Sequence, residues 1–456
     1  MVGLSIAFAL IALSGPGERA AGLGERAAGL GGASDGVAAR AASKGAAATK
    51  VEPGLALLAA KVLVCSLEGP MAVDNAVVLV RDGVIVALGD RDEVQIPAGY
   101  DVRDLGDLWL SPGMIDLHSH VAMGLNDLSE TVFLTNPGMR ASVGVVPGYV
   151  HMQDAVAGGV TTVLHIPGSA TNMGGAGVIL RTGGATYEDM LVRDPGSLKL
   201  AQAGNPERRG PWFPQRSLMN WNTRDTFRRG VAYAKRWLAH ELGGAPKPER
   251  DLQFDVFISL LKREAQVSTH TQMAQVVGMT LSLVAEEFKL PVFIDHGTFD
   301  GYRVAGRAAE LGIIAILGPR QISVPYNRPG FTIDQDGALY GVAERYQAAG
   351  HRMVGFNTDA VGPPSSNGPG QEELSLQAAM GVRYGFNNDD GAAVRGVTIV
   401  PAIAAGIDKR VGSIEPGKDA DLIATKGDPN DPRASVELVL MRGRVIYDTA
   451  VDRRRF

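Results

Sequence analysis

Residues 111–120 read SPGMIDLHSH, a Pro-Gly pair followed by an apolar run and two histidines, His118 and His120. A short apolar run bounded by Pro and Gly is typical of a buried strand. Side chains at positions i and i+2 of a strand face the same side, so both imidazoles can bind one cation. This stretch therefore predicts a strand that ends in a metal site.

Seven more apolar segments follow, and helical stretches alternate with them. This alternation favours βα units around a parallel sheet, and eight such units close into a barrel whose active site lies at the carboxyl ends of the strands. We predict an α/β fold with a (β/α)8 TIM-like barrel over residues 111–405. The eight predicted strands are Gly113–His118, Thr161–His165, Val178–Arg181, Ser197–Ala201, Gln266–His270, Val292–His296, Ile313–Leu317 and Met353–Thr358.

Both flanks of the predicted barrel are rich in short β-type runs. Residues 76–89 read AVVLVRDGVIVALG and residues 437–448 read ELVLMRGRVIYD, each with a turn dipeptide, Asp82-Gly83 or Arg442-Gly443, between two apolar runs. Such a pattern is typical of a hairpin. Residues 51–110 and 406–456 are therefore predicted to pair into a small β-sandwich beside the barrel.

The first 50 residues have a different composition. Val2–Ser14 is long enough for the core of an export signal but short for a membrane span, and no Lys or Arg precedes it. We predict export to a periplasmic or extracellular location, without a stable membrane span in the mature protein. If the run is instead a disordered tail, the protein is cytoplasmic. The Gly/Ala-rich tract that follows, with GERAAGL at 17–23 and again at 24–30, predicts a flexible linker.

The composition excludes several classes of function. The 456 residues carry a net charge of -5, so no basic excess is available to neutralise nucleic acid, and a small molecule is the expected partner. A single cysteine, Cys65, excludes an intramolecular disulfide framework and a multi-cysteine zinc site. Nucleophile-elbow, phosphate-loop and dinucleotide motifs are absent from the sequence. The sequence does not determine oligomeric state, and a homo-oligomer remains possible.

Four of the eight histidines fall at the ends of three predicted strands, the first, fifth and sixth: His118, His120, His270 and His296. Asp359 follows the last predicted strand and would lie beside the first. Imidazole and carboxylate suit a divalent cation, with zinc the first expectation and iron, nickel or manganese as alternatives. The spacing of these residues matches successive barrel units, so we expect all five side chains on one rim.

The same segments resemble the amidohydrolase superfamily. SPGMIDLHSH is similar to its metal-binding signature, whereas GGVTTVLHIPGSATNMGG, FIDHGTFDGYRVA and VGSIEPGKDADLIAT resemble segments of its imidazolonepropionase-like branch. The likeness spans about residues 55–450. The resemblance implies metal and catalytic positions at the following residues: His118, His120, His270, His296 and Asp359.

Three further residues each have two interpretations. The segment around Lys199 resembles the context of the family's carboxylated lysine. Lys199 either is carboxylated and bridges two metal ions, or is an unmodified lysine that is exposed or contacts substrate. The sequence therefore allows a site for one ion or for two. His165, at the end of the second predicted strand, either polarises a substrate carbonyl or bonds a neighbouring loop. Arg181 either binds a substrate carboxylate or, as we prefer, pairs with a nearby Asp or Glu.

These residues predict a metal-dependent hydrolase of carbon–nitrogen bonds. A metal-activated hydroxide would attack an amide, a cyclic amide or a dipeptide-like bond, and Asp359 would transfer the proton, with His296 and His165 as further catalytic candidates. The alternatives are a metal-dependent deaminase and a non-catalytic binding or assembly protein that keeps the barrel.

Overall fold

The computed structural model describes residues 53–208, 213–323, 327–328, 331–332, 339–362 and 368–456. The predicted export signal and linker in residues 1–50 lie outside these ranges. In the described part of the chain, no helix combines the length and the apolar character that crossing a membrane requires.

The eight strands predicted for the barrel form one sheet in the order β17-β12-β11-β10-β9-β8-β7-β6. The ring is nearly closed, because a parallel bridge joins Ser119, at the end of β6, to Ala360, just after β17. The strands are β6 (Met114–Ser119), β7 (Val160–His165), β8 (Met173–Arg181), β9 (Leu191–Ala201), β10 (Gln266–His270), β11 (Val292–His296), β12 (Ala315–Leu317) and β17 (Val354–Phe356).

The expectation of an entirely parallel sheet is wrong for β8, which runs antiparallel to both β7 and β9. The connection from β7 to β8 is only residues 166–172 and contains no helix. A parallel crossover needs a dozen or more residues, so a link this short can only return the chain in the opposite direction. The other neighbouring strands of the ring are parallel.

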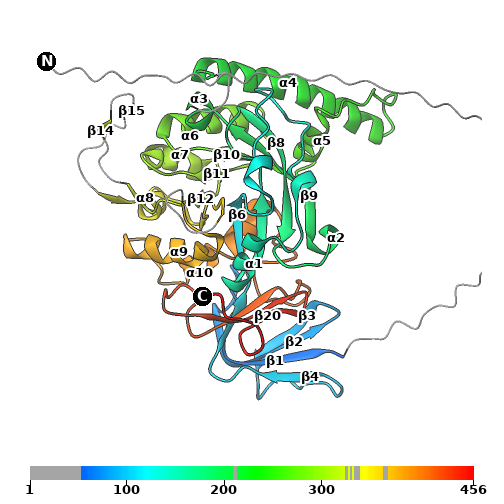
Figure 1. Cartoon of the computed structure of the whole chain (residues 1–456), viewed down its shortest axis with the longest axis vertical. Helices are drawn as coiled ribbons and strands as arrows, with labels where there is room; N and C mark the ends of the chain where they lie inside the picture. Colours follow the sequence, from blue (N-terminus) through cyan, green and yellow to red (C-terminus); the bar gives the residue numbers. More distant parts are fainter. Residues whose placement is uncertain (1–52, 209–212, 324–326, 329–330, 333–338, 363–367) are drawn as a thin grey trace, which may run out of the picture. The chain divides into compact units, whose positions relative to one another are not determined.

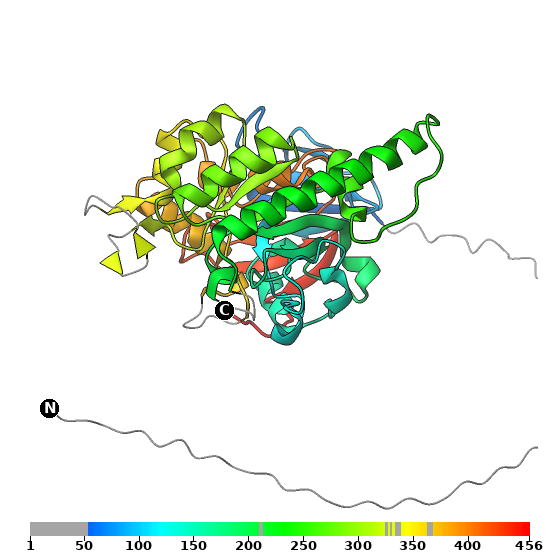
Figure 2. The same ribbon diagram turned by 90° about the horizontal axis from the view of Figure 1, so that it is seen from above.

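Helices cover the outside of the ring, as the alternating pattern predicts. The longest, α4 (Arg216–Glu241), lies at the periphery in Figure 1 and projects beyond the sheets in Figure 2. The others are α1 (Val150–Ala157), α2 (Tyr187–Met190), α3 (Asn205–Arg208), α5 (Asp255–Leu261), α6 (Ala274–Thr280), α7 (Ala305–Glu310), α8 (Val342–Ala348), α9 (Leu374–Arg383), α10 (Ala392–Arg395) and α11 (Ile399–Ala405).

The apolar side chains of the strands divide into an outer and an inner set. Met114, Ile294 and Leu317 pack outward in one cluster with residues of the covering helices. Ile115 and Phe293, early in β6 and β11, pack in a second cluster with residues of α11, and the Ile115 amide donates to Val397 O at 2.8 Å. Apolar packing thus fills the amino ends of these strands, which leaves the polar residues to the carboxyl ends.

Strands from both flanks of the barrel pair into a second sheet, as predicted, and the blue and red strands lie together in Figure 1. It is a single sheet in the order β20-β19-β18-β5-β1-β2-β3, with β4 paired to β1, so the predicted two-sheet sandwich is not confirmed. The strands are β1 (Leu55–Leu63), β2 (Ala72–Arg81), β3 (Val84–Asp90), β4 (Asp101–Asp104), β5 (Trp109–Pro112), β18 (Leu422–Thr425), β19 (Val436–Met441) and β20 (Arg444–Asp448).

Candidate metal centre

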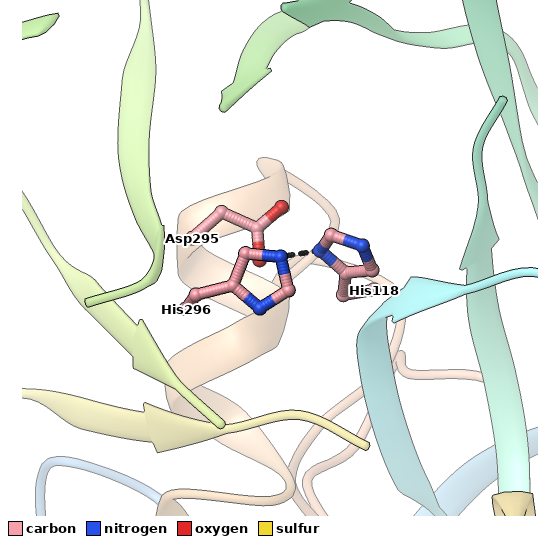
Figure 3. Close-up of side chains that lie close together, drawn as sticks. All are labelled: His118, Asp295 and His296. Carbon is pink, nitrogen blue, oxygen red and sulfur yellow. Dashed lines mark ion pairs between the residues drawn. The ribbon is translucent and has the colours of Figure 1, made fainter. Parts of the chain in front are cut away.

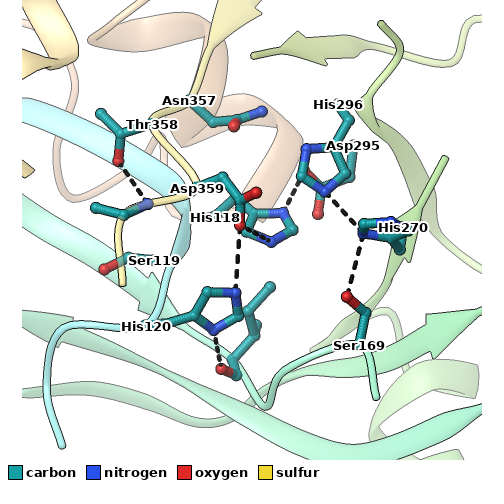
Figure 4. Close-up of polar contacts among 12 residues, drawn as sticks. His118, Ser119, His120, Ser169, His270, Asp295, His296, Asn357, Thr358 and Asp359 are labelled. Carbon is teal, nitrogen blue, oxygen red and sulfur yellow. Dashed lines mark hydrogen bonds and ion pairs between the residues drawn. The ribbon is translucent and has the colours of Figure 1, made fainter. Parts of the chain in front are cut away.

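Three of the predicted ligands converge on one point between β6 and the loop after β17. Asp359 Oδ1 lies 3.2 Å from His118 Nε2 and 3.4 Å from His120 Nε2. Both imidazoles are buried, whereas the side chain of Asp359 is 30% exposed. Figure 4 shows the carboxylate between the two rings. The structure therefore brings together residues that are 239 positions apart in the chain, counting from His120 to Asp359.

The second nitrogen of each of these rings is already engaged. His118 Nδ1 lies 2.7 Å from Asp295 Oδ1, and His120 Nδ1 lies 2.7 Å from the backbone oxygen of Ile166. Because an oxygen acceptor at Nδ1 requires the proton there, each neutral ring presents the Nε2 lone pair to the centre. Figure 3 shows Asp295 beside His118 and His296. Sequence reasoning missed Asp295.

His270 and His296 form a second group. His270 Nδ1 lies 3.0 Å from His296 Nε2 and 3.3 Å from Ser169 Oγ. His296 Nδ1 lies 3.0 Å from the Gly318 backbone oxygen, so its proton belongs there and Nε2 holds a lone pair. His270 Nδ1 either donates a proton to that lone pair or joins it in binding a cation. Figure 4 shows this pair beyond His118.

The arrangement fits a divalent cation. Ligand atoms at zinc distances of about 2.0 to 2.1 Å in a tetrahedral array lie about 3.3 to 3.4 Å apart. Asp359 Oδ1 lies 3.2 Å from His118 Nε2 and 3.4 Å from His120 Nε2, which matches this spacing. Neutral imidazoles whose outer nitrogens are held by a carboxylate or a carbonyl are also the usual support of a metal site. His118, His120 and Asp359 could hold one ion, and His270 and His296 could contribute to another.

Two of these residues have an unusual backbone conformation. His296 has φ 71° and Asp359 has φ 51°, both in the left-handed region that non-glycine residues rarely adopt. Such a conformation costs on the order of 1 kcal/mol or more and persists only where the surroundings impose it. At the end of β11 it breaks the strand alternation, so that Asp295 and His296 both face the centre rather than opposite sides.

A buried carboxylate, Asp116, ties the loop that carries Asp359 to β6. Its Oδ1 accepts from the His118 amide at 2.9 Å, and its Oδ2 accepts from the Thr358 amide at 3.0 Å, the Thr358 hydroxyl at 2.6 Å and Gln371 Nε2 at 2.7 Å. One side chain thus binds the backbone beside both His118 and Asp359. Sequence reasoning missed Asp116, although it lies two residues before His118 in the quoted signature.

Burial and neighbouring charges set the protonation of the centre. Burial lowers the pKa of His118, but the Asp295 carboxylate outweighs this and raises it to about 8. Burial and the charge of His118 lower the pKa of His296 to about 4, and burial holds the pKa of His270 well below its usual value. Burial would raise the pKa of Asp359, but His118 and His120 hold it well below its usual range. Asp359 is therefore ionised at neutral pH.

Lys199 is buried inside the centre, so the interpretation as an exposed lysine is wrong. It extends from β9, and its Nζ lies 3.3 Å from His118 Nε2. Burial lowers the pKa of its ammonium group. Its charge also lowers the pKa of His270 and the pKa of His296.

The polar partners of His165 and Arg181 are residues other than the ligands described above. His165 is fully buried; its Nδ1 accepts from the Ala122 amide at 3.4 Å, its Nε2 has no partner in the described residues, and burial lowers its pKa to about 3. Arg181 pairs with Asp421 at 2.9 Å and with Asp419 at 2.5 Å, which agrees with the interpretation we preferred. Those two carboxylates come from the segment just before β18, so Arg181 joins the ring to the second sheet.

Comparison with known proteins gives a consistent picture. The profile of the amidohydrolase family matches residues 340–450. An amidohydrolase of Hapsidospora irregularis is 24% identical over 408 residues, which are 82% of this chain but only 40% of that longer protein. Imidazolonepropionase of Sphingopyxis alaskensis is 24% identical over 393 residues, 78% of this chain and 88% of that protein.

Solved structures agree with these relatives. An amidohydrolase from Thermotoga maritima aligns with a TM-score of 0.71 and 27% identity, covering 86% of this chain and 100% of that chain. A protein described as a putative prolidase, from Bifidobacterium longum, shares the fold at a TM-score of 0.52 and 18% identity, covering 87% of this chain and 95% of that chain. The chain is thus similar to members of the amidohydrolase superfamily, including its imidazolonepropionase-like branch.

Proposed function

We propose that this protein is a divalent-metal-dependent hydrolase of carbon–nitrogen bonds in amides, cyclic amides or dipeptide-like substrates. The observation that carries the proposal is the position of Asp359 Oδ1 at the carboxyl ends of the strands, 3.2 Å from His118 Nε2 and 3.4 Å from His120 Nε2. Relatives that include imidazolonepropionases and an amidohydrolase support the bond class. We propose zinc as the metal, because imidazole and carboxylate ligands suit it.

In this proposal each residue has a defined task. A bound divalent cation would supply Lewis acidity, which lowers the pKa of water and polarises the carbonyl under attack. His118 and His120 hold their lone pairs toward the cation position because Asp295 and the Ile166 carbonyl fix their protons. Asp359, ionised and partly exposed, accepts the proton of the attacking water and delivers it to the leaving nitrogen.

Two residues extend this scheme. If Lys199, whose Nζ lies 3.3 Å from His118 Nε2, were carboxylated, it would offer oxygen ligands for a second ion. His165 keeps its proton on Nε2, because Nδ1 accepts from the Ala122 amide, and it can donate that proton to a substrate oxygen. We also propose that the mature protein is exported, because of the apolar run at Val2–Ser14.

The test combines metal analysis with a variant. We expect stoichiometric metal in the purified protein. We also expect it to hydrolyse members of a panel of lactams, dipeptides and N-acyl amino acids, and this hydrolysis should stop when a chelator removes the metal. Asp359→Asn should lower kcat by roughly 10²- to 10⁴-fold, the usual contribution of a general acid–base group, and should lower metal content much less. The matched control is Asp74→Asn, which changes an exposed carboxylate that pairs with Lys61. It should leave kcat and metal content unchanged.

Two results would contradict the proposal. Protein without stoichiometric metal, with activity that ignores chelator, would favour a binding or assembly protein that has kept the barrel. An Asp359→Asn protein that keeps its metal and most of its turnover would remove the role of Asp359 as proton acceptor while leaving the metal centre in place.

A further inference from the structure

Arg320 is an exposed arginine that follows β12, three residues after Leu317. Its guanidinium carbon lies over the ring of Phe299, 5.0 Å from the ring centroid. Phe299 itself follows β11, three residues after His296. Both residues therefore belong to the carboxyl-end rim of the barrel, where substrate must enter.

The backbone beneath Arg320 is anchored on both sides. Before it, the Gly318 amide donates to His296 O at 3.1 Å, and Gly318 O lies 3.0 Å from His296 Nδ1. After it, the Val342 amide donates to Gln321 O at 2.9 Å. The aromatic ring covers one face of the guanidinium, and this leaves the in-plane N–H groups to bind an acceptor.

No carboxylate in the described ranges pairs with this guanidinium. Carboxylates at neighbouring strand ends have other partners. Asp300 accepts from the Ala274 amide at 3.0 Å, and Glu207 accepts from the Gly204 amide at 2.7 Å and from Arg216 Nε at 2.9 Å. The charge of Arg320 thus has no counterion among the described residues at the rim.

The distance to the metal centre suits a small substrate. Gly318 touches His296, and two residues of chain span at most about 7 Å, so the Arg320 backbone lies within that distance of Gly318. A molecule the size of an N-acyl amino acid or a dipeptide can bridge from this guanidinium to the histidines. We propose that Arg320, stacked on Phe299, binds the carboxylate of the substrate and makes the enzyme select acids over neutral amides. This inference rests on the proposed function.

The test compares substrates that differ only in that carboxylate. Each N-acetyl-L-amino acid and dipeptide of the panel is paired with its C-terminal carboxamide, and cleavage of the internal amide bond is followed by chromatography. We expect Arg320→Gln to lower kcat/KM for the acids by on the order of 10- to 100-fold, mainly through KM, as the loss of a charge-assisted hydrogen bond does. Turnover of the carboxamides should change less than about twofold.

The matched control is Arg229→Gln, because Arg229 also lies 5.0 Å from an aromatic ring centroid, that of Phe254, but on helix α4. Arg229→Gln should change kcat/KM neither for the acids nor for the carboxamides. A second readout is calorimetric binding of the same substrate pairs to the zinc-loaded Asp359→Asn protein, with and without Arg320→Gln.

The inference is overturned if Arg320→Gln affects acids and carboxamides equally, or affects neither, while the wild type hydrolyses both. In that case the hydrolase proposal stands. If the wild type neither hydrolyses nor binds any pair, the proposed function fails and the role of Arg320 fails with it. A loss confined to the acids, in turnover or in binding, supports the inference.

Discussion

Asp295→Asn should change how metal affinity depends on pH. Asp295 Oδ1 lies 2.7 Å from His118 Nδ1 and raises the pKa of His118 from 6.5 to about 8, despite burial that acts in the opposite direction. That net shift corresponds to about 2 kcal/mol in favour of the charged imidazole. His120, His270 and His296 all have a lowered pKa, so His118 is the ligand whose proton competes with metal near neutral pH.

The direction in which metal affinity changes with pH follows from this competition between the His118 proton and the metal. In the wild type, affinity should rise about tenfold per pH unit up to about pH 8 and then level off, because metal must displace the His118 proton below that pKa. In Asp295→Asn the pKa of His118 falls below 6.5, so affinity levels off at lower pH. Its plateau should be roughly 10- to 100-fold weaker, the typical effect of losing the group that orients a metal ligand.

The assay is competition with a chromophoric chelator for zinc between pH 6 and 9. The difference between the two proteins should be largest at pH 9 and should nearly close at pH 6, where proton competition costs the wild type about 100-fold. Asp74→Asn serves again as the control and should follow the wild type. Parallel profiles for Asp295→Asn and wild type would refute the assigned electrostatic role of Asp295.

Two further changes test the framework that supports the centre. Arg181→Ala should lower the free energy of unfolding by about 3 to 5 kcal/mol in urea, because it leaves the buried Asp421 carboxylate without its cation. Gly318→Ala would place a methyl carbon 2.1 Å from the Asn357 backbone oxygen, so the chain must shift, at a cost of about 1 to 3 kcal/mol. Since Gly318 O contacts His296 Nδ1, zinc affinity should fall together with thermal stability.

Each of these two changes has a control of the same residue type. Arg433→Ala removes an arginine that is 89% exposed from its pair with Asp431, and should change stability by less than about 0.5 kcal/mol. Gly312→Ala changes a glycine at φ 68° with no atom within 4 Å of the added carbon, so it should lower stability through backbone strain without affecting zinc. If Arg181→Ala lowered the free energy of unfolding no more than Arg433→Ala does, the ion pairs of Arg181 would not stabilise the fold.

The sequence predicted the barrel strands because each is a short apolar run, and hydrophobic pattern reports burial directly. It does not report strand direction, and β8 was therefore expected to be parallel. The length of the link from β7, residues 166–172, contains that information, because it is too short for a helical crossover. The strands of the two flanking segments were predicted from the same apolar pattern as the barrel strands. Whether these strands form one sheet or two depends on how their edges meet, which the pattern does not report.

The ligands that lie at strand ends could be predicted, since strand ends meet at one rim. Asp295 could not, because regular alternation sets it opposite His296, and only the left-handed backbone of His296 brings both to one side. Asp116 was concealed for another reason. Its role depends on hydrogen bonds to Thr358, and contacts between distant segments follow from packing rather than from local pattern.

The second sheet has a consequence for how the protein folds during synthesis. Strand β5 pairs with β18, more than 300 residues later, and only Gly113 separates β5 from β6, the strand that carries His118. On the ribosome, the open edge of β5 must therefore wait for almost the entire chain to emerge. Contacts of such long sequence separation form slowly, so the nascent chain depends on protection of this edge from aggregation until β18 arrives.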